Sequence, residues 1–194
     1  VDVAMIQAEQ PTRAFSGAAK GEGPMVKAFY RMIEMADDSA VTMEAILAPH
    51  RERTIQRMRH ESIVLNIQDG CDLNYNSLSE CEGLGVIGKN QTSASSQGLH
   101  LHSSFVVNND GLPLGVLRAD CSTPLPKSEQ TSHEEKKTNH WLTATEDSNI
   151  LAKQLPTTRI INVMDREGDF FGQFEQPRHK RVDLLVRAKH NRKT

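Results

Sequence analysis

Two short runs of β-branched and apolar residues in this chain each end in an aspartate. Ile63–Gln68 is followed by Asp69, and Arg159–Met164 is followed by Asp165. Runs of this length and composition predict β-strands. If a helix between them carries the chain back across the sheet, the two strands are parallel and their carboxyl ends lie at the same edge. The two carboxylates are therefore expected to converge.

The rest of the second half predicts a mixed α/β sheet with flanking helices. Asn108–Gly111 is a strong hairpin signal between strand-like runs at 99–107 and 112–119. Residues 70–98 are polar and rich in Gly and Ser, and we interpret them as a long loop. The remaining expected elements are a helix at 141–155, a short helix near 168–174 and a last strand at 182–187.

The first sixty residues predict a small helical segment, so we divide the chain into residues 1–60 and an α/β domain at 61–194. Apolar residues recur at helical spacing from Met25 to Ile33. Thr42 is a candidate N-cap for a second helix. Pro49 suits the first turn of a third helix, which is expected to reach about residue 60.

Composition limits the class of protein. The 194 residues include 37% hydrophobic residues, which is enough for a core and excludes disorder throughout. No apolar run approaches the roughly 20 residues of a membrane helix, and the three cysteines lack the spacing of a disulfide framework or a zinc knuckle. We expect a soluble cytoplasmic protein. Although the net charge is −2, the sequence contains two local basic patches, at 51–59 and 177–194.

The paired aspartates suggest metal chemistry. Two carboxylates at neighbouring strand ends repel each other, which favours a divalent cation between them. Oxygen ligands select Mg²⁺ or Mn²⁺ over zinc, and such ions support phosphodiester cleavage or transfer. The alternative is that Asp69 and Asp165 only cap the loops after their strands, and the pattern alone leaves both interpretations open.

Two other motifs are compatible with different functions, nucleotide binding and zinc binding. Gly83–Gly88 and Lys89 partly match a dinucleotide or phosphate-binding loop, but the expected strand, helix and hydroxyl residue are missing around them. We expect no nucleotide cofactor and interpret the segment as a flexible loop. His100 and His102 would share one face of a strand and could bind zinc with Cys121 or His133, although packed histidines are the favoured interpretation.

Two further residues are assigned to structure rather than to chemistry. Trp141 could stack on a base, but it lies in a helical apolar pattern and is expected in the core. Asp169 is expected in the first turn of the following helix rather than at a metal.

Six strings then indicate a family. They are IVLNIQDGCDLNY, GLHLHSSFVV, PLGVL, EEKKTNHWL, IINVMDREGDF and LLVRAKHNRK. In this order and spacing, over about residues 14–194, the chain resembles bacterial insertion-sequence transposases of the DDE type. Within them it is most similar to the IS-four class, to which the transposon-five enzyme belongs.

The resemblance implies an RNase H-like catalytic core that binds Mg²⁺, with Mn²⁺ as a substitute. Asp69 and Asp165 match the first and second catalytic acids, and Arg187 matches an arginine that approaches a phosphate near the cleaved transposon end. A basic stretch follows, in which backbone-phosphate contacts are expected; it contains Lys189, His190 and Arg192. The implied partner is DNA, with a homodimer in the full-length synaptic complex.

The chain also departs from the family. The third acid, a glutamate in a Tyr/Arg/Glu/Lys motif, has no counterpart in these 194 residues, and most of the helical region that reads the transposon ends is missing. The usual Asp-Thr-Thr is Asp69-Gly70-Cys71 here. We therefore expect a truncated core that is inactive by itself. The alternative is a remnant without catalysis that binds DNA or dimerises.

Overall fold

The computed structural model describes residues 2–36, 38–78, 80–89, 95–124, 137–189 and 191. The chain divides into two compact units, Val1–Pro49 and His50–Thr194. The first unit is helical, as expected, and its division from the second falls at Pro49 rather than after residue 60. It contains α1 (Asp2–Glu9), α2 (Phe15–Ala18), α3 (Gly23–Ile33) and the start of α4 (Met43–Met58). Buried Phe15 stacks on Phe29 in its core, with ring centroids 4.3 Å apart.

Helix α4 is continuous, so the prediction of two separate helices around Pro49 is wrong. The predicted N-cap is confirmed, because Thr42 Oγ1 accepts the backbone N–H of Ala45 at 3.1 Å. Pro49 lies inside the helix. Its fixed φ is close to the helical value, so the chain continues through it, and the missing N–H removes only the bond to the Ala45 carbonyl.

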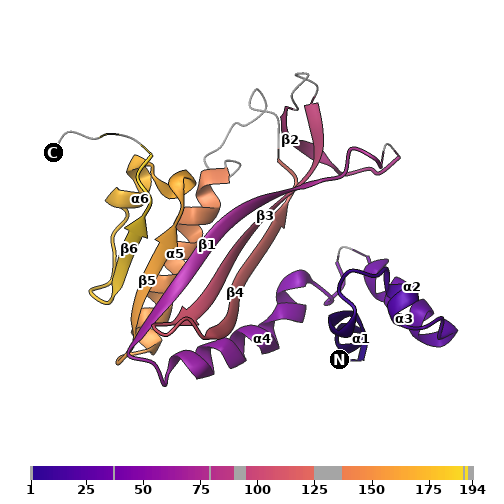
Figure 1. Cartoon of the computed structure of the whole chain (residues 1–194), viewed down its shortest axis with the longest axis horizontal. Coiled ribbons are helices and arrows are strands. Elements are labelled where there is room, and N and C mark those ends of the chain that lie inside the picture. Colours follow the sequence, from indigo (N-terminus) through magenta and orange to yellow (C-terminus); the bar gives the residue numbers. More distant parts are fainter. Residues whose placement is uncertain are drawn as a thin grey trace. The chain divides into compact units, whose positions relative to one another are not determined.

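The second unit is built on one six-stranded mixed sheet, which confirms the predicted α/β class (Figure 1). Its elements are β1 (Ile63–Asn74), β2 (Gly85–Lys89), β3 (Ser95–Asn108), β4 (Pro113–Ser122), α5 (Lys137–Gln154), β5 (Arg159–Met164), the 3₁₀ turn η1 (Arg166–Gly168), α6 (Phe171–Glu175) and β6 (Val182–Val186). The order is β2-β3-β1-β5-β6, and β4 also pairs with β3. β5 is parallel to β1 and to β6, whereas β3 is antiparallel to its three partners.

Part of the region predicted as a long loop is strand. β1 continues past Asp69 to Asn74, and Gly85–Lys89 forms β2 instead of a flexible loop. Both pair with the first part of β3, where a Cβ at Gly98 would lie 1.9 Å from the Leu73 carbonyl oxygen. These polar, Gly-rich segments lack apolar alternation, so their strand structure depends on pairing with distant residues.

The predicted hairpin between β3 and β4 is confirmed. Asn108 Oδ1 accepts the backbone N–H groups of Asp110 at 3.0 Å and Leu112 at 2.8 Å. Gly111 has φ +82, a left-handed conformation that glycine adopts without steric strain. The turn residues alone therefore specify this connection.

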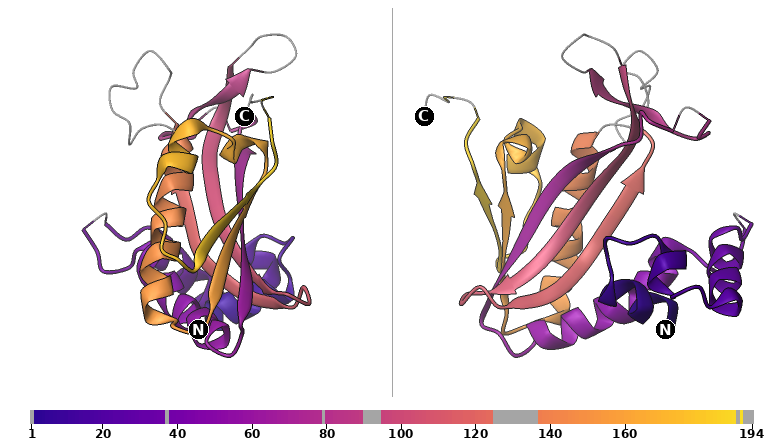
Figure 2. Two further views of the ribbon diagram at one scale, coloured as in Figure 1. Left: turned by 90° about the vertical axis from the view of Figure 1, so that its left-hand side faces the viewer. Right: turned by 45° about the vertical axis from the view of Figure 1, so that its right-hand side comes forward.

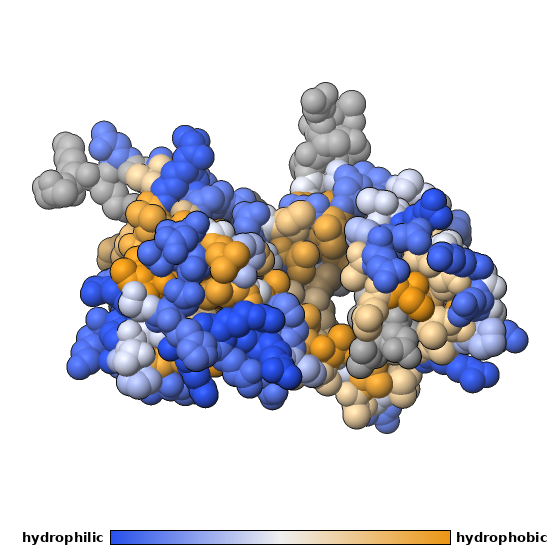
Figure 3. Space-filling model, turned by 60° about the horizontal axis from the view of Figure 1, so that its bottom comes forward, coloured by the Kyte–Doolittle hydropathy of each residue, from blue (hydrophilic) through white to orange (hydrophobic). Residues whose placement is uncertain are grey.

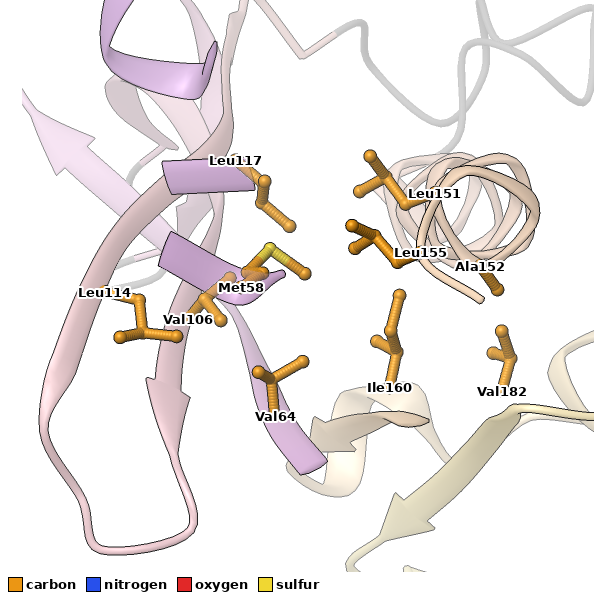
Figure 4. Close-up of a cluster of buried hydrophobic side chains, with 10 residues drawn as sticks. All are labelled: Met58, Val64, Val106, Leu114, Leu117, Leu151, Ala152, Leu155, Ile160 and Val182. Carbon is orange, nitrogen blue, oxygen red and sulfur yellow. The ribbon is translucent and has the colours of Figure 1, made fainter. Parts of the chain in front are cut away.

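Helix α5 covers one face of the sheet (Figure 2). Its last turn and the residue that follows it supply Leu151, Ala152 and Leu155 to a buried apolar cluster (Figure 4). The other members are Met58, Val64, Val106, Leu114, Leu117, Ile160 and Val182. Among the helices that the structure describes, α5 included, none is long and apolar enough to cross a membrane.

The outer edge of β4 is closed by side chains of α4. His50 Nε2 accepts the N–H of Val116 at 2.9 Å, and Arg57 donates to the Leu114 carbonyl at 2.7 Å. Between them Gly115 has φ +140, and a Cβ there would lie 2.2 Å from Thr54 Oγ1. Glycine lets the helix approach closely enough to satisfy edge groups that would otherwise be open to pairing with another strand.

Candidate metal and nucleic-acid site

Three residues that the sequence singled out lie level with one another on neighbouring strands. In the sheet, Gln68 of β1 is paired with Met164 of β5, which is paired with Val186 of β6. The three residues of interest each come one position after this row. Asp69, Asp165 and Arg187 come next, and the N–H of Arg187 extends the ladder by donating to the Met164 carbonyl at 3.0 Å. β1 and β5 are hydrogen-bonded neighbours, so the two aspartates lie on adjacent strands.

These three residues lie on the face opposite α5. Gln68 and Met164 are buried on the face that α5 covers, and successive residues of a strand point to opposite faces. Asp69, Asp165 and Arg187 are all exposed. The alternation and the exposure together place two carboxylates and one guanidinium on the same solvent-facing side of the sheet.

The same face carries a second row, which is apolar. Phe105, Ile67, Val163 and Leu185 are paired across β3, β1, β5 and β6. Phe105 and Ile67 are each 37% exposed and Leu185 is 59% exposed. Figure 3 looks at the end of the molecule that is at the bottom in Figure 1, and there too apolar side chains reach the surface among polar ones.

The two aspartates differ in their local structure. Asp165 follows the end of β5, and its Oδ1 accepts the N–H of Glu167 at 2.7 Å, capping η1. Asp69 does not end a strand, because β1 continues past it. The prediction that both aspartates follow strand ends is therefore correct only for Asp165, and one Asp165 oxygen has the capping role that the sequence left open.

Asp69 and Asp165 offer the oxygen ligands that Mg²⁺ prefers. The cap at Glu167 uses one oxygen of Asp165, which leaves its other oxygen for a cation. Across the described ranges, however, no group of three or more His, Cys, Asp or Glu side chains is arranged to hold a metal ion. Asp69 and Asp165 are therefore candidates for two ligands of a Mg²⁺ ion, and further ligands would have to come from elsewhere.

Asp169 links the chain after β6 to the chain after β5. It is buried, and its Oδ2 accepts the N–H of Lys189 at 2.5 Å. It lies between η1 and α6 rather than in the first turn of a helix, so that prediction is wrong. The backbone of exposed Lys189 is thereby held at Asp169, whereas His190 and Arg192 fall outside the described residues.

Positive charge accumulates before β6 as well. Desolvation, followed by the charges of Arg181, Lys180 and Lys153, lowers the pKa of His179. Arg181 also donates to the Ala152 carbonyl at 2.5 Å, so this arginine has a structural role. The basic patch at the end of the chain is therefore partly held in place by the fold.

The sequence analysis missed a cluster of buried amides beneath α5. Asn162 is fully buried, and its Oδ1 accepts hydrogen bonds from Asn66 Nδ2 at 2.9 Å, Gln68 Nε2 at 3.0 Å and Ser148 Oγ at 2.8 Å. The signal was present, since every second residue of these strands faces inward and Asn66, Gln68 and Asn162 occupy such positions.

His100 and His102 share the covered face of β3, as predicted. His100 Nδ1 lies 2.8 Å from Asp72 Oδ1. The His102 ring packs edge-to-face on Trp141 with centroids 4.8 Å apart, and Trp141 is buried in the core, which confirms its prediction. Burial, and then the neighbouring His140, lower the pKa of His102 to about 4.

Within the described part of the chain, the histidines lie beside an ion-pair network of Arg118 with Asp120 and Asp147. Asp120 accepts from Arg118 and lies 3.3 Å from His140 Nδ1; burial opposes ionisation of Asp120, but these two partners hold its pKa below the usual value. Cys121, the next residue of β4, is exposed, and His133 is not among the described residues.

Gly70, which replaces a threonine of the resembled motif, makes room for His100. A Cβ at Gly70 would lie 3.1 Å from Cε1 and 3.3 Å from Nε2 of the His100 ring. Such a contact is tighter than side chains normally make. The departure at this position therefore accompanies the buried histidine on the neighbouring strand.

Comparisons with known proteins do not assign a family. No family model and no curated protein matches the chain. Among solved structures, the chain is similar to the "Crystal structure of the Mos1 Strand Transfer Complex" at 9% identity, covering 96% of this chain and 57% of that one, with a TM-score of 0.27. The chain thus spans little more than half of that protein's length, and a TM-score of this size assigns neither fold nor function.

Proposed function

We propose that this chain is the catalytic core of a DDE-type DNA transposase with an RNase H-like fold. The observation that carries the proposal is that Asp69, Asp165 and Arg187 each come one residue after the paired positions Gln68, Met164 and Val186 of three adjacent strands. The sheet also supports it, because β1 is central, with antiparallel β3 on one side and parallel β5 on the other. The motif resemblance supplies the assignment to the IS-four class of insertion-sequence enzymes.

Asp69 and Asp165 would hold Mg²⁺ on the exposed face. When bound, such ions activate a water or a 3′-hydroxyl and stabilise the leaving oxygen of a phosphodiester. The residues of this chain would position the DNA. Arg187 and Lys189, whose backbone N–H groups bond to Met164 and Asp169, would bind backbone phosphates through their cationic side chains. Asp169, which holds the Lys189 amide, keeps that cationic segment beside β5.

The complete enzyme would hydrolyse DNA and transfer strands at transposon ends as a homodimer in the cytoplasm. Its sequence preference would come from other contacts, because phosphate contacts fix position and carry little sequence information.

A second function, DNA binding without catalysis, has specific support. One oxygen of Asp165 caps η1, and the described residues provide no third metal ligand around the two acids. In that case the basic residues after β6 would bind phosphates and the two aspartates would have only structural roles.

Binding of Mn²⁺ alone separates the two functions. In an NMR titration, the paramagnetic ion should broaden amide signals around Asp69 and Asp165, and Asp69→Asn or Asp165→Asn should weaken this effect at least about tenfold, because each removes a charged ligand. Asp110→Asn changes an exposed carboxylate of the β3–β4 turn and serves as the matched control.

Broadening centred elsewhere, or equal in wild type, Asp69→Asn and Asp165→Asn, would contradict metal binding at this site. If the chain still bound DNA in that case, with a salt dependence reduced in Arg187→Ala, the second function would be supported.

A further inference from the structure

The amide cluster beneath α5 joins the two strands that carry the acids. It consists of Asn66, Gln68, Asn162 and Ser148. Gln68 directly precedes Asp69, and its side chain crosses from β1 to β5 to reach Asn162 Oδ1 at 3.0 Å. Asn66 is the register partner of Asn162 and donates to the same oxygen at 2.9 Å. All four side chains are at least 98% buried.

Apolar burial alone leaves the register of β1 and β5 undecided. A slip of one residue would turn the buried side chains outward, so burial forbids it. A slip of two residues keeps every side chain on its own face. Val64 and Ile160, which are partners in this structure, would then meet other inward-facing positions, and nothing in the apolar pattern distinguishes the two arrangements.

The amides do distinguish them. After a slip of two residues in one direction, Asn162 would lie opposite Val64, which has no donor for its Oδ1. After a slip in the other direction, Asn162 would lie opposite Gln68, and the donor of Asn66 would be displaced by two residues. Asn66 Oδ1, Gln68 Oε1 and Asn162 Nδ2 have no hydrogen-bond partner among the described residues, so the bonds on Asn162 Oδ1 are the ones that depend on register. Loss of buried amide hydrogen bonds is strongly disfavoured, and single buried polar groups are known to fix register in other folds. A slip of this kind would also move Asp69 about 7 Å along β1 relative to Asp165.

We infer that the amide cluster, through Asn66 Nδ2 and Gln68 Nε2 on Asn162 Oδ1, sets the register of β1 against β5 and so aligns Asp69 with Asp165. These are positioning residues on the opposite face of the sheet from the acids. The consequence for metal binding rests on the proposed function, whereas the register itself does not.

The test replaces the whole cluster with apolar side chains. The variant combines Asn66→Val, Gln68→Leu, Asn162→Val and Ser148→Ala, so that no partner is left unpaired. The control is Gln173→Leu with Thr145→Val, which removes another fully buried polar pair, between α6 and α5, with neither partner on β1 or β5. Cross-strand backbone NOEs between β1 and β5 report the register directly.

We expect the control to keep the wild-type NOEs, which connect Val64 with Ile160 and Asn66 with Asn162. The apolar variant should add a second set displaced by two residues. If the aligned register falls to about one tenth of the population, apparent Mn²⁺ affinity falls about tenfold. A folded variant with only the original register overturns the inference.

If the apolar variant fails to fold, the exchange Asn162→Met with Met164→Asn decides the question. It keeps composition and moves the amide by two residues along β5, so the register should move with it. An unchanged register, or a loss of the fold, overturns the inference. Absence of Mn²⁺ binding in wild type would refute the proposed function instead, and the NOEs would still decide the register.

Discussion

His102 makes the stability of the sheet unit depend on pH. Its ring is fully buried between β3 and α5, against Trp141, and its pKa falls from 6.5 to about 4. The imidazole is therefore neutral in the folded state. Between these two pH values the unfolded chain binds a proton that the folded chain does not, so stability falls as pH falls through this range and is unaffected by this group above it.

The magnitude follows from the two pKa values. One pKa unit corresponds to about 1.4 kcal/mol, so His102 removes roughly 3 kcal/mol of stability below pH 4. Between pH 7 and pH 5 the loss is about 2 kcal/mol. This is a large fraction of the stability of an ordinary domain.

The assay is urea unfolding followed by fluorescence of Trp141, the single tryptophan of the chain. His102→Gln cannot take up a proton in this range. We therefore expect the free energy of unfolding of the wild type to fall by about 2 kcal/mol more than that of the variant between pH 7 and pH 5. His60→Gln, which alters an exposed histidine, is the control and should run parallel to wild type.

Two results would refute this reasoning. One is that wild type and His102→Gln lose stability in parallel as the pH falls. The other is a native-state NMR titration of the His102 ring with a midpoint near 6.5. Either would mean that the ring reaches solvent or gains a carboxylate partner when protonated.

Three further predictions concern the fold and the DNA contact. Gly115→Ala should lower the free energy of unfolding by about 3 kcal/mol through overpacking and backbone strain, because its Cβ would meet Thr54 Oγ1 at 2.2 Å. Gly111→Ala, where φ is +82 and the space is open, should lower it by only about 1 kcal/mol. Equal losses in the two variants would contradict a packing effect at Gly115. Arg187→Ala should reduce the salt dependence of DNA affinity by about one phosphate contact, measured by anisotropy across a salt series, and an unchanged slope would remove it from the interface. Asp169→Ala should accelerate hydrogen exchange of the Lys189 amide, which now donates to its carboxylate at 2.5 Å, and unchanged protection would show that other bonds hold that segment.

The elements that could be predicted are those whose information is local. The hairpin at Asn108–Gly111 depends on turn residues that are adjacent in the chain, and the start of β1 on its β-branched residues. β2 and the far end of β1 could not be predicted, because their Gly-rich and polar sequences become strands only by pairing with β3. The continuity of α4 through Pro49 was missed for a similar reason, since proline suits both a first turn and, with one bond lost, a helix interior.

The candidate site, too, could be predicted from the sequence only in part. The aspartates and the basic residues were visible in the sequence, because charged side chains after apolar runs stand out. Their common row was not, since Arg187 is level with Asp165 only through the β5–β6 register. The amide cluster was visible as polar residues at inward positions, but its meaning depends on the partners that Asn162 meets from β1 and α5.

The sequence by itself determined the strands that begin with alternating or β-branched residues, where the β3–β4 turn lies, and which acidic and basic side chains are available for chemistry. Only the tertiary structure decided which strands are neighbours, in which register, and which polar groups satisfy one another. The physical reason is that alternation and turn propensity act over a few residues, whereas strand pairing and the satisfaction of buried amides join residues as distant as Asn66 and Asn162.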